Sequence, residues 1–328
     1  MSGPTRRLVP YGALRAAWRS RQSLPRVAQP LSRAVDAEPP RNPIFVIGCP
    51  RSGTTMLLDA LLASPELASV DKEGHVLWRA HHHPRRSGWD SDALGAADVS
   101  ERERRYVNLA IRMFARASRF VDKTPENCLR VPYLRELFGD ASFVFLCRRA
   151  GANVGSLMEG WRAWPRYVAY RLPVPLTGLG ERSGRDWSFA LIPGWRELTA
   201  APLEEICARQ YVACNEAALA ARADAAPGRW HDVTYEDLVA DPVATLAGLY
   251  SGLGLSFSGA PERHARELPA RPAATALSPP REGKWRELDG PAIERVAELF
   301  EPTERRLGYG AGSSPQSPSP PVNSTNES

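Results

Sequence analysis

The segment from Gly48 to Thr55 constrains the fold of this 328-residue chain more than any other segment. A short apolar run, residues 43–48, precedes it, and good helix formers follow from Thr54 to Ala63. Its two glycines, five positions apart, let the backbone turn its N–H groups inward on an anion, and the start of a helix adds a partial positive charge. The sequence therefore predicts a buried strand, a phosphate-binding loop and a helix capped by Thr54.

The cation of this loop stands inside the turn. A Walker loop continues with a Lys after its last glycine, whereas Gly53 is followed by Thr54. Arg51 lies within the turn, and its fork of donors suits a phosphate or a phosphosulfate, while Ser52, Thr54 and Thr55 add hydroxyl groups. Because metal-assisted transfer of a γ-phosphate depends on the missing Lys, the loop disfavours a P-loop kinase.

The alternation of strand and helix recurs twice along the chain. Residues 141–147 form a second buried apolar run before a segment from about 152 to 161, and residues 229–235 lead toward a helix from about 243 to 253. Repeated units of this kind predict a three-layer α/β/α domain with a mostly parallel central sheet. We assign this domain to residues 41–310 and expect its ligands beyond the carboxyl ends of the strands.

The two ends of the chain differ in composition from this domain. Residues 1–40 are rich in Arg, Ala, Pro and Ser and predict a poorly ordered basic leader, either a solvated tail or a peripheral contact with an acidic surface or membrane. Residues 311–328 are rich in Ser and Pro and predict a disordered tail. The net charge of +5 is too small to indicate nucleic acid as a partner.

Cysteine usage and hydropathy indicate a cytoplasmic protein. The five cysteines are scattered and include no Cys-x-x-Cys pair, so neither a disulfide framework nor a zinc site is expected. No apolar run reaches the roughly 18–20 residues that a membrane crossing needs, and the basic N-terminus lacks the apolar stretch of a secretory signal. His81, His82 and His83 are adjacent and therefore point in different directions, so no metal site is expected there.

The segment from Pro50 to Thr55 resembles the 5′-phosphosulfate loop, Pro-Arg/Lys-Ser-Gly-Thr-Thr, of the superfamily of sulfotransferases that depend on 3′-phosphoadenylyl sulfate (PAPS). The resemblance implies a P-loop-like fold of the bacterial sulfotransferase type, PAPS as the sulfuryl donor, adenosine 3′,5′-bisphosphate (PAP) as the product, and no required metal. It also implies that the 5′ end of PAPS is bound by Arg51, Ser52, Gly53, Thr54 and Thr55. Met56 stands where some members carry a Trp against the adenine.

Other segments resemble the rest of the donor site of this family. The family places an Arg at the end of a strand and a Ser eight residues later, and Arg148 and Ser156 have this spacing, with Arg149-Ala150 in place of the usual Asp-Pro. Such an Arg and Ser can both face one anion, here the 3′-phosphate. The Tyr-Glu-Asp segment at 235–237 and the basic segment 280–286 also resemble the family, which implies donor binding by Tyr235, Arg281 and Lys284.

The catalytic candidates come from two further segments. Lys123-Thr124-Pro125 resembles the segment that supplies a catalytic Lys in several branches of the family, which implies that Lys123 stabilises the departing bridging oxygen. A carboxylate follows the phosphate loop at nearly the distance found in family members with a Glu base, so Glu73 is the favoured general base. His75 is the alternative, because His suits proton transfer near neutral pH.

The segment 160–200 interrupts the strand–helix alternation, which predicts that it forms a lid over the acceptor. Its seven aromatic residues either contact an apolar or ring-bearing acceptor or belong to the core. The sequence as a whole predicts a sulfotransferase that acts on a hydroxyl of a small-molecule or lipid-like acceptor. A P-loop kinase and a non-catalytic nucleotide-binding scaffold are the alternatives.

Overall fold

The computed structural model of the chain describes residues 32, 37–71, 73–115, 119–270, 277 and 283–310. Most of the predicted basic leader (residues 1–40), the whole predicted tail (residues 311–328) and Arg281 lie outside the described residues. Within the described ranges, no helix combines the length and the apolar character that crossing a bilayer requires.

A five-stranded sheet forms the centre of the molecule, and all of its strand pairs are parallel. The strand order is β2-β3-β1-β4-β7. The chain therefore leaves β1 for β2 and β3 on one side and later crosses to β4 and β7 on the other side. The carboxyl end of β1 therefore faces a topological switch point, where ligands of such sheets bind. The strands are β1 Ile44–Ile47, β2 Leu67–Ala68, β3 Arg119–Lys123, β4 Ser142–Cys147 and β7 Trp230–Thr234.

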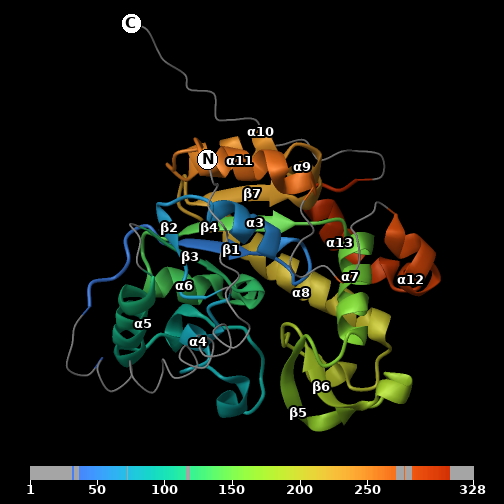
Figure 1. Cartoon of the computed structure of the whole chain (residues 1–328). Helices are drawn as coiled ribbons and strands as arrows, with labels where there is room; N and C mark the ends of the chain where they lie inside the picture. The colour runs from blue at the N-terminus through green and yellow to red at the C-terminus, as the bar shows by residue number, and fades with distance from the viewer. Residues whose placement is uncertain are drawn as a thin grey trace, which may run out of the picture.

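Helices cover both faces of this sheet (Figure 1), which confirms the predicted three-layer α/β/α fold. On one face lie α3, α9, α10 and α11, and on the other lie α4, α5, α6 and α8. The helices are α3 Thr54–Leu61, α4 His75–Trp78, α5 Glu101–Phe114, α6 Val131–Leu137, α7 Ala150–Arg162, α8 Leu203–Ala223, α9 Tyr235–Ala240, α10 Pro242–Gly252, α11 Ala260–Glu267, α12 Lys284–Glu294 and α13 Ala297–Arg306. Short 3₁₀ turns are η1 Pro84–Ser87, η2 Ala96–Asp98, η3 Pro125–Arg130, η4 Gly180–Arg182, η5 Trp195–Leu198 and η6 Leu268–Ala270.

The central strands are apolar on both sides because each side packs against a helical layer. In β1, Ile44 and Val46 pack with α3, α10 and α11, whereas Phe45 and Ile47 pack with the layer that contains α5, α6 and α8. All four side chains are fully buried. Continuous apolar runs are expected of parallel strands that are covered on both faces.

Two boundaries differ from those that the sequence predicted. Thr54 is the first residue of α3 and not its cap, because the N-cap residue is Gly53 and no side chain caps the helix there. Tyr235 begins α9 and does not end β7, which stops at Thr234. Both residues are thus the first residue of a helix and do not lie before it.

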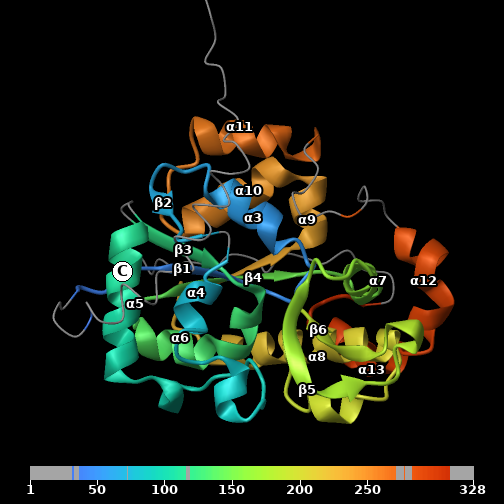
Figure 2. The same cartoon turned by 60° about the horizontal axis from the view of Figure 1, so that its bottom comes forward.

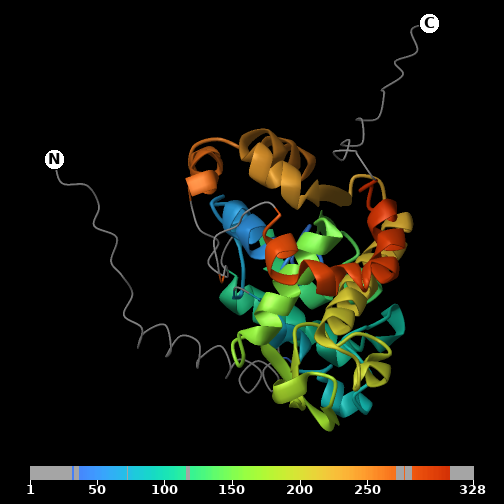
Figure 3. The same cartoon turned by 90° about the vertical axis from the view of Figure 1, so that its right-hand side faces the viewer.

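The segment after α7 forms an antiparallel pair of strands, β5 Val168–Leu176 and β6 Gly184–Ser188, beside the main sheet (Figure 2). α12 and α13 then lie against α7 and α8 (Figure 3), so the C-terminal helices help to fix α7. Helix α7 follows β4 directly and thereby occupies the edge of the region where the strands end.

Most aromatic side chains of residues 160–200 belong to the core. Trp161, Trp187 and Trp195 are at most 2% exposed, and the rings of Trp161 and Trp187 pack edge to face with centroids 5.3 Å apart. Of the seven aromatic residues in this segment, Tyr167 and Phe189 line the cavity described below. The core alternative therefore holds for most of these residues.

Candidate active site

The loop between β1 and α3 is shaped by close backbone contacts. A Cβ atom on Gly48 would lie 2.3 Å from the carbonyl oxygen of Leu146, and a Cβ atom on Gly53 would lie 2.7 Å from Cδ2 of Tyr235. Gly53 also has φ 108°, and Arg51 has φ 70°, a left-handed conformation that non-glycine residues adopt rarely and mostly at functional sites. The turn thus needs its glycines and holds Arg51 in an unusual conformation.

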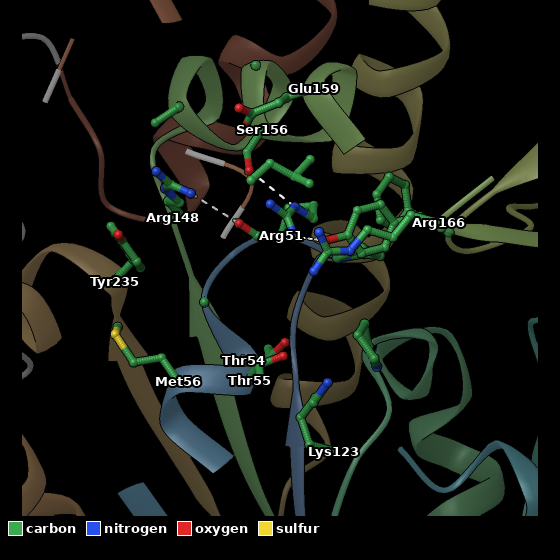
Figure 4. Close-up of a pocket in the computed structure, with 18 of the residues that line it drawn as sticks. Arg51, Thr54, Thr55, Met56, Lys123, Arg148, Ser156, Glu159, Arg166 and Tyr235 are labelled. Carbon is green, nitrogen blue, oxygen red and sulfur yellow. Dashed lines mark hydrogen bonds between the residues drawn. The ribbon is translucent and has the colours of Figure 1, made fainter. Parts of the chain in front are cut away.

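A cavity of about 410 Å³ opens beyond the carboxyl ends of β1, β3, β4 and β7 (Figure 4). Loop 50–56 and α7 line it, together with the start of α9, the start of α12 and the first residues of β5. The structure brings most of the predicted site residues to this one cavity: Arg51, Gly53, Thr54, Thr55, Glu73, His75, Lys123, Arg148, Ser156, Tyr235 and Lys284.

Ser52 is placed differently from the prediction that its hydroxyl lines the donor site. The residue is fully buried below the loop and does not line the cavity. Its backbone N–H donates to the carbonyl oxygen of Cys49 (3.1 Å), and its Oγ atom has no hydrogen-bond partner among the described residues. Ser52 therefore supports the turn from inside and leaves the outer face to the two threonines.

Arg51 connects the loop to α7 and to Tyr167, the residue that precedes β5. Its Nε donates to Oγ of Ser156 (3.3 Å), and its Nη1 donates to the hydroxyl oxygen of Tyr167 (3.1 Å). Its guanidinium carbon lies 5.0 Å from the centroid of the Tyr167 ring. The loop cation and the predicted 3′-phosphate serine are thus neighbours in space.

Arg148 leaves the end of β4 and packs against the loop. Its Nη1 donates to the carbonyl oxygen of Arg51 (3.1 Å), and its guanidinium group lies over the ring of Tyr235, 4.2 Å from the centroid. Its Nε is buried and has no hydrogen-bond partner in the described part of the chain. Burial lowers the pKa of Arg148, so an anion beside it would stabilise its charge.

The start of α7, which carries Arg148 just before it, is capped by residues distant in sequence. The backbone N–H of Arg149 donates to Oε1 of Glu236 (3.1 Å), and the backbone N–H of Ala150 donates to Oε1 of Glu304 in α13 (2.8 Å). Arg149-Ala150 replaces the Asp-Pro of the family pattern, and these two glutamates supply carboxylates at the helix start. Negative charge at this end is stabilising.

An ion pair stands opposite the loop. Nζ of Lys123 lies 2.6 Å from Oε1 of Glu73, and Nε2 of His75 lies 2.9 Å from Oε2 of the same carboxylate. Partial burial raises the pKa of Glu73, but the hydrogen bond with His75 and the charge of Lys123 outweigh it and lower this pKa to about 2. Glu73 is therefore ionised at neutral pH.

The end of β3 fixes the turn that carries Glu73 and His75. The backbone N–H of Gly74 donates to Oγ1 of Thr124 (2.8 Å), and that hydroxyl donates to the buried Asp122 (3.3 Å). A Cβ atom on Gly74 would lie 2.4 Å from Oδ1 of Asp122, so the contact requires glycine. The Lys-Thr-Pro segment thus positions both base candidates as well as Lys123.

A model of the sulfotransferase family matches residues 43–168 and 184–259 of this sequence, which include the loop, Lys123 and Arg148. The chain belongs to the sulfotransferase family. It is 28% identical over 142 residues to nodulation protein NoeE of Sinorhizobium fredii, a match that covers 39% of this chain and about a third (33%) of that relative's length.

Two solved sulfotransferase structures resemble this family member across most of its length. STF9 from Mycobacterium avium superposes with a TM-score of 0.59 at 15% identity, covering 92% of this chain and 87% of the other. STF1 from Mycobacterium tuberculosis superposes with a TM-score of 0.49 at 19% identity, covering 89% and 87%. The similarity to STF9 confirms the predicted P-loop-like sulfotransferase fold.

In this sulfotransferase, the start of α12 closes one side of the cavity. Nζ of Lys284 lies 2.9 Å from Oε1 of Glu159 in α7. The indole of Trp285 packs so closely on α7 that a Cβ atom on Gly151 would lie 2.5 Å from it, and one on Gly155 would lie 2.8 Å from Cβ of Trp285. Trp285, from the basic segment 280–286, and Tyr167, one of the seven aromatic residues of segment 160–200, line the cavity, as does Arg166, which the sequence had not singled out.

The three consecutive histidines of this sulfotransferase have separate structural roles. His81 packs on the ring of Tyr106. Nε2 of His82 lies 2.8 Å from Oε2 of Glu103, and His83 accepts a hydrogen bond from the backbone N–H of Arg85 (3.1 Å). Within the described ranges, no group of three or more His, Cys, Asp or Glu side chains is arranged to hold a metal ion.

Proposed function

We propose that this sulfotransferase transfers the sulfuryl group of PAPS to a hydroxyl of a small-molecule or lipid-like acceptor. One observation carries the proposal. A phosphate loop with an internal arginine opens into the same cavity as Arg148 and Ser156 on one side and the ion pair of Glu73 and Lys123 on the other. An anionic nucleotide and a reacting hydroxyl can thus be held side by side.

The residues present fit an anionic nucleotide such as PAPS. The cavity of about 410 Å³ lies within the range of small-molecule sites, roughly 300–1,000 Å³. The buried Nε of Arg148 has no partner in the described chain, and the missing Cβ of Gly53 leaves room for Tyr235 beside the loop. Arg51, Gly53, Thr54 and Thr55 would hold the 5′ end of the nucleotide. Arg148 and Ser156 would hold its 3′-phosphate.

The acidic and basic groups opposite the loop suit the chemistry of transfer. In this reaction, the acceptor oxygen bonds to sulfur while the bond from sulfur to the bridging phosphate oxygen breaks. Lys123 would donate a hydrogen bond to that departing oxygen. With Glu73 ionised, Nε2–H of His75 donates to its carboxylate, which leaves Nδ1 free to accept a proton. We therefore assign general base to His75 and orientation of its ring to Glu73, the reverse of the order favoured from sequence.

The acceptor would enter past the first residues of β5. Arg166, Tyr167 and Val168 line the cavity there, together with Phe189 at the end of β6. This placement supports the role of residues 160–200 as an acceptor lid, with Trp161, Trp187 and Trp195 in the core below. The five cysteines are all buried free thiols, which supports the predicted cytoplasmic location.

Calorimetry with PAP and with ATP plus Mg²⁺ tests the donor assignment. We expect PAP to bind tightly and Mg-ATP weakly, because Arg148 and Ser156 are placed for a 3′-phosphate. Arg148→Gln should weaken PAP by 10-fold or more, on the order of one lost charged hydrogen bond, while Arg171→Gln, an exposed residue of β5 outside the cavity, should not. Tight binding of Mg-ATP with indifference to PAP would favour a kinase.

Transfer from labelled PAPS to a panel of hydroxylated acceptors then separates an enzyme from a nucleotide-binding scaffold. We expect the wild type to form a sulfated product and the Lys123→Met variant to form almost none. PAP binding without any transfer across the panel, with no slow release of sulfate from PAPS in water, would favour the scaffold.

A further inference from the structure

Arg166 is a cation of the cavity wall that has no task in the roles assigned above. It lies between the end of α7 and the start of β5, and its side chain is exposed to the cavity. Among the residues that the structure describes, no carboxylate pairs with its guanidinium group. The group instead lies over the ring of Tyr167, 5.5 Å from the centroid.

Three other basic side chains that line the cavity lie close to carboxylates. Lys123 pairs with Glu73 at 2.6 Å, and Lys284 pairs with Glu159 at 2.9 Å. Arg79 lies 3.9 Å from Glu126. Arg166 therefore adds positive charge to the cavity that the described carboxylates do not balance.

Tyr167 places Arg166 next to the cation of the phosphate loop. The guanidinium groups of Arg51 and Arg166 lie 5.0 Å and 5.5 Å from the centroid of the same ring, and the hydroxyl of Tyr167 accepts a hydrogen bond from Arg51. Figure 4 shows Arg166 pointing toward Arg51, while Lys123 points into the same space from β3. Two guanidinium groups on one ring concentrate positive charge at this place, which favours binding of an anion there.

We propose that Arg166 binds the sulfuryl group of PAPS, as a further residue for the transfer itself. The proposal rests on the proposed function, since it takes PAPS as the donor. Arg51 belongs to the loop for the 5′ end, and Lys123, assigned to the bridging oxygen, points into the same space as Arg166 (Figure 4), so we place Arg166 at that end. Arg148, on the ring of Tyr235, marks the other end of the nucleotide.

The role of Arg166 is electrostatic, and no bond to it forms or breaks. The acceptor oxygen forms its bond to sulfur, and the bond from sulfur to the bridging oxygen breaks. The bridging oxygen keeps the electron pair and leaves as part of the 5′-phosphate of PAP, while the acceptor proton passes to His75. Arg166 donates to the non-bridging sulfuryl oxygens throughout and so distinguishes PAPS from PAP.

Binding measurements with PAPS and PAP test this assignment without an acceptor, because the two nucleotides differ by the sulfuryl group. Calorimetry at low temperature, with chromatography to confirm that PAPS stays intact, gives both dissociation constants. We expect Arg166→Gln to weaken PAPS about 10-fold or more and PAP by less than about 2-fold. Arg166→Lys, which keeps the charge, should retain part of the preference for PAPS.

Arg171→Gln is the matched control, since Arg171 is an exposed arginine of β5 that does not line the cavity. It should change neither constant. If Arg166→Gln weakens the binding of PAPS and of PAP equally, Arg166 contacts the nucleotide and not the sulfuryl group. If it weakens the binding of neither, Arg166 serves the acceptor. Both results overturn the inference. Wild-type protein that binds neither nucleotide would instead overturn the proposed function.

Discussion

The ammonium group of Lys123 lies 2.6 Å from a carboxylate oxygen of Glu73, yet the two side chains differ in exposure. Lys123 is 2% exposed at the end of β3, whereas Glu73 is 37% exposed on the cavity wall. The pair thus joins a buried cation to an anion that a substrate can reach. Entry of a donor anion would compete with Glu73 for the ammonium group, which links donor binding to the state of the base candidates.

We predict that Lys123→Met raises the pKa of Glu73 from about 2, because the variant removes a charge that lowers it. Since folding lowers this pKa below its usual 4.5, ionised Glu73 stabilises the wild type above about pH 4.5, and that stabilisation is lost as the pH falls toward 2. In the Lys123→Met variant, the stabilisation by ionised Glu73 should be lost at a higher pH than in the wild type. NMR titration of carbon-13-labelled Glu side chains measures the pKa directly.

The same variant separates catalysis from binding. We expect Lys123→Met to transfer sulfate about 100-fold more slowly or worse, as when one transition-state donor is removed. PAP binding should weaken far less, because a bound anion only replaces Glu73 as the partner of the ammonium group. Unchanged transfer, together with an unchanged titration of Glu73, would show that the pair has no catalytic role.

The strands that surround the loop could be predicted because they follow a simple physical rule. Residues of β1 and β4 are buried on both faces, so their sequences are continuous apolar runs. β3 was not predicted as a strand, since Arg119, Asp122 and Lys123 break such a run. The burial of Asp122 and Lys123 is compensated by polar partners outside the strand. Asn127 donates a hydrogen bond to Asp122 (2.7 Å), and Lys123 pairs with Glu73, which lies 50 residues away in sequence.

Site residues that belong to a sequence motif could be predicted, whereas residues that reach the cavity only through tertiary packing could not. The loop and Arg148 have fixed spacings that can be recognised in sequence. Arg166 follows a proline in a segment without a motif, and the pattern of that segment did not distinguish Tyr167, which lines the cavity, from the aromatic residues in the core. Trp285 belongs to the family-like segment 280–286, but its packing depends on the return of α12 to α7. The glycines Gly151 and Gly155 were the available signal, because helix interiors disfavour glycine unless a close contact requires it.

These glycines give the second prediction. Gly151→Ala should displace Trp285, because the new Cβ atom would lie 2.5 Å from its indole ring. We expect weaker PAP binding and a lower free energy of unfolding, although Ala favours helix by about 1 kcal/mol over Gly. Calorimetry and urea unfolding measure the two effects.

Gly248→Ala in α10 is the control for this substitution. Gly248 is exposed, and a Cβ atom there would have nothing within 4 Å. It should gain about 0.5–1 kcal/mol of stability without changing PAP affinity. If Gly151→Ala gains stability in the same way, the packing of Trp285 on α7 does not hold the cavity closed.

The third prediction concerns the carboxylate that caps α7 from α13. Glu304→Ala removes the acceptor of the Ala150 N–H and should lower the free energy of unfolding by about 1 kcal/mol, as loss of a helix cap does. PAP affinity should fall as well, because Arg148 lies two residues before the capped position. Glu301→Ala, whose side chain is 52% exposed and 3.8 Å from Arg305, should cost less than about 0.5 kcal/mol and leave PAP binding unchanged. Equal effects of the two variants would argue against the cap.

The fourth prediction decides between the two base candidates. His75→Ala should lower transfer about 100-fold or more, and added imidazole should restore part of it, because a free base can occupy the vacated space. Glu73→Gln should lower transfer less, since the amide oxygen still accepts from Nε2–H of His75 and keeps the ring oriented. PAP affinity serves as the check that both variants fold. A Glu73→Gln variant that is as inactive as His75→Ala, without rescue of the latter by imidazole, would return the role of base to Glu73 and would require Lys123 to release that carboxylate before the proton moves.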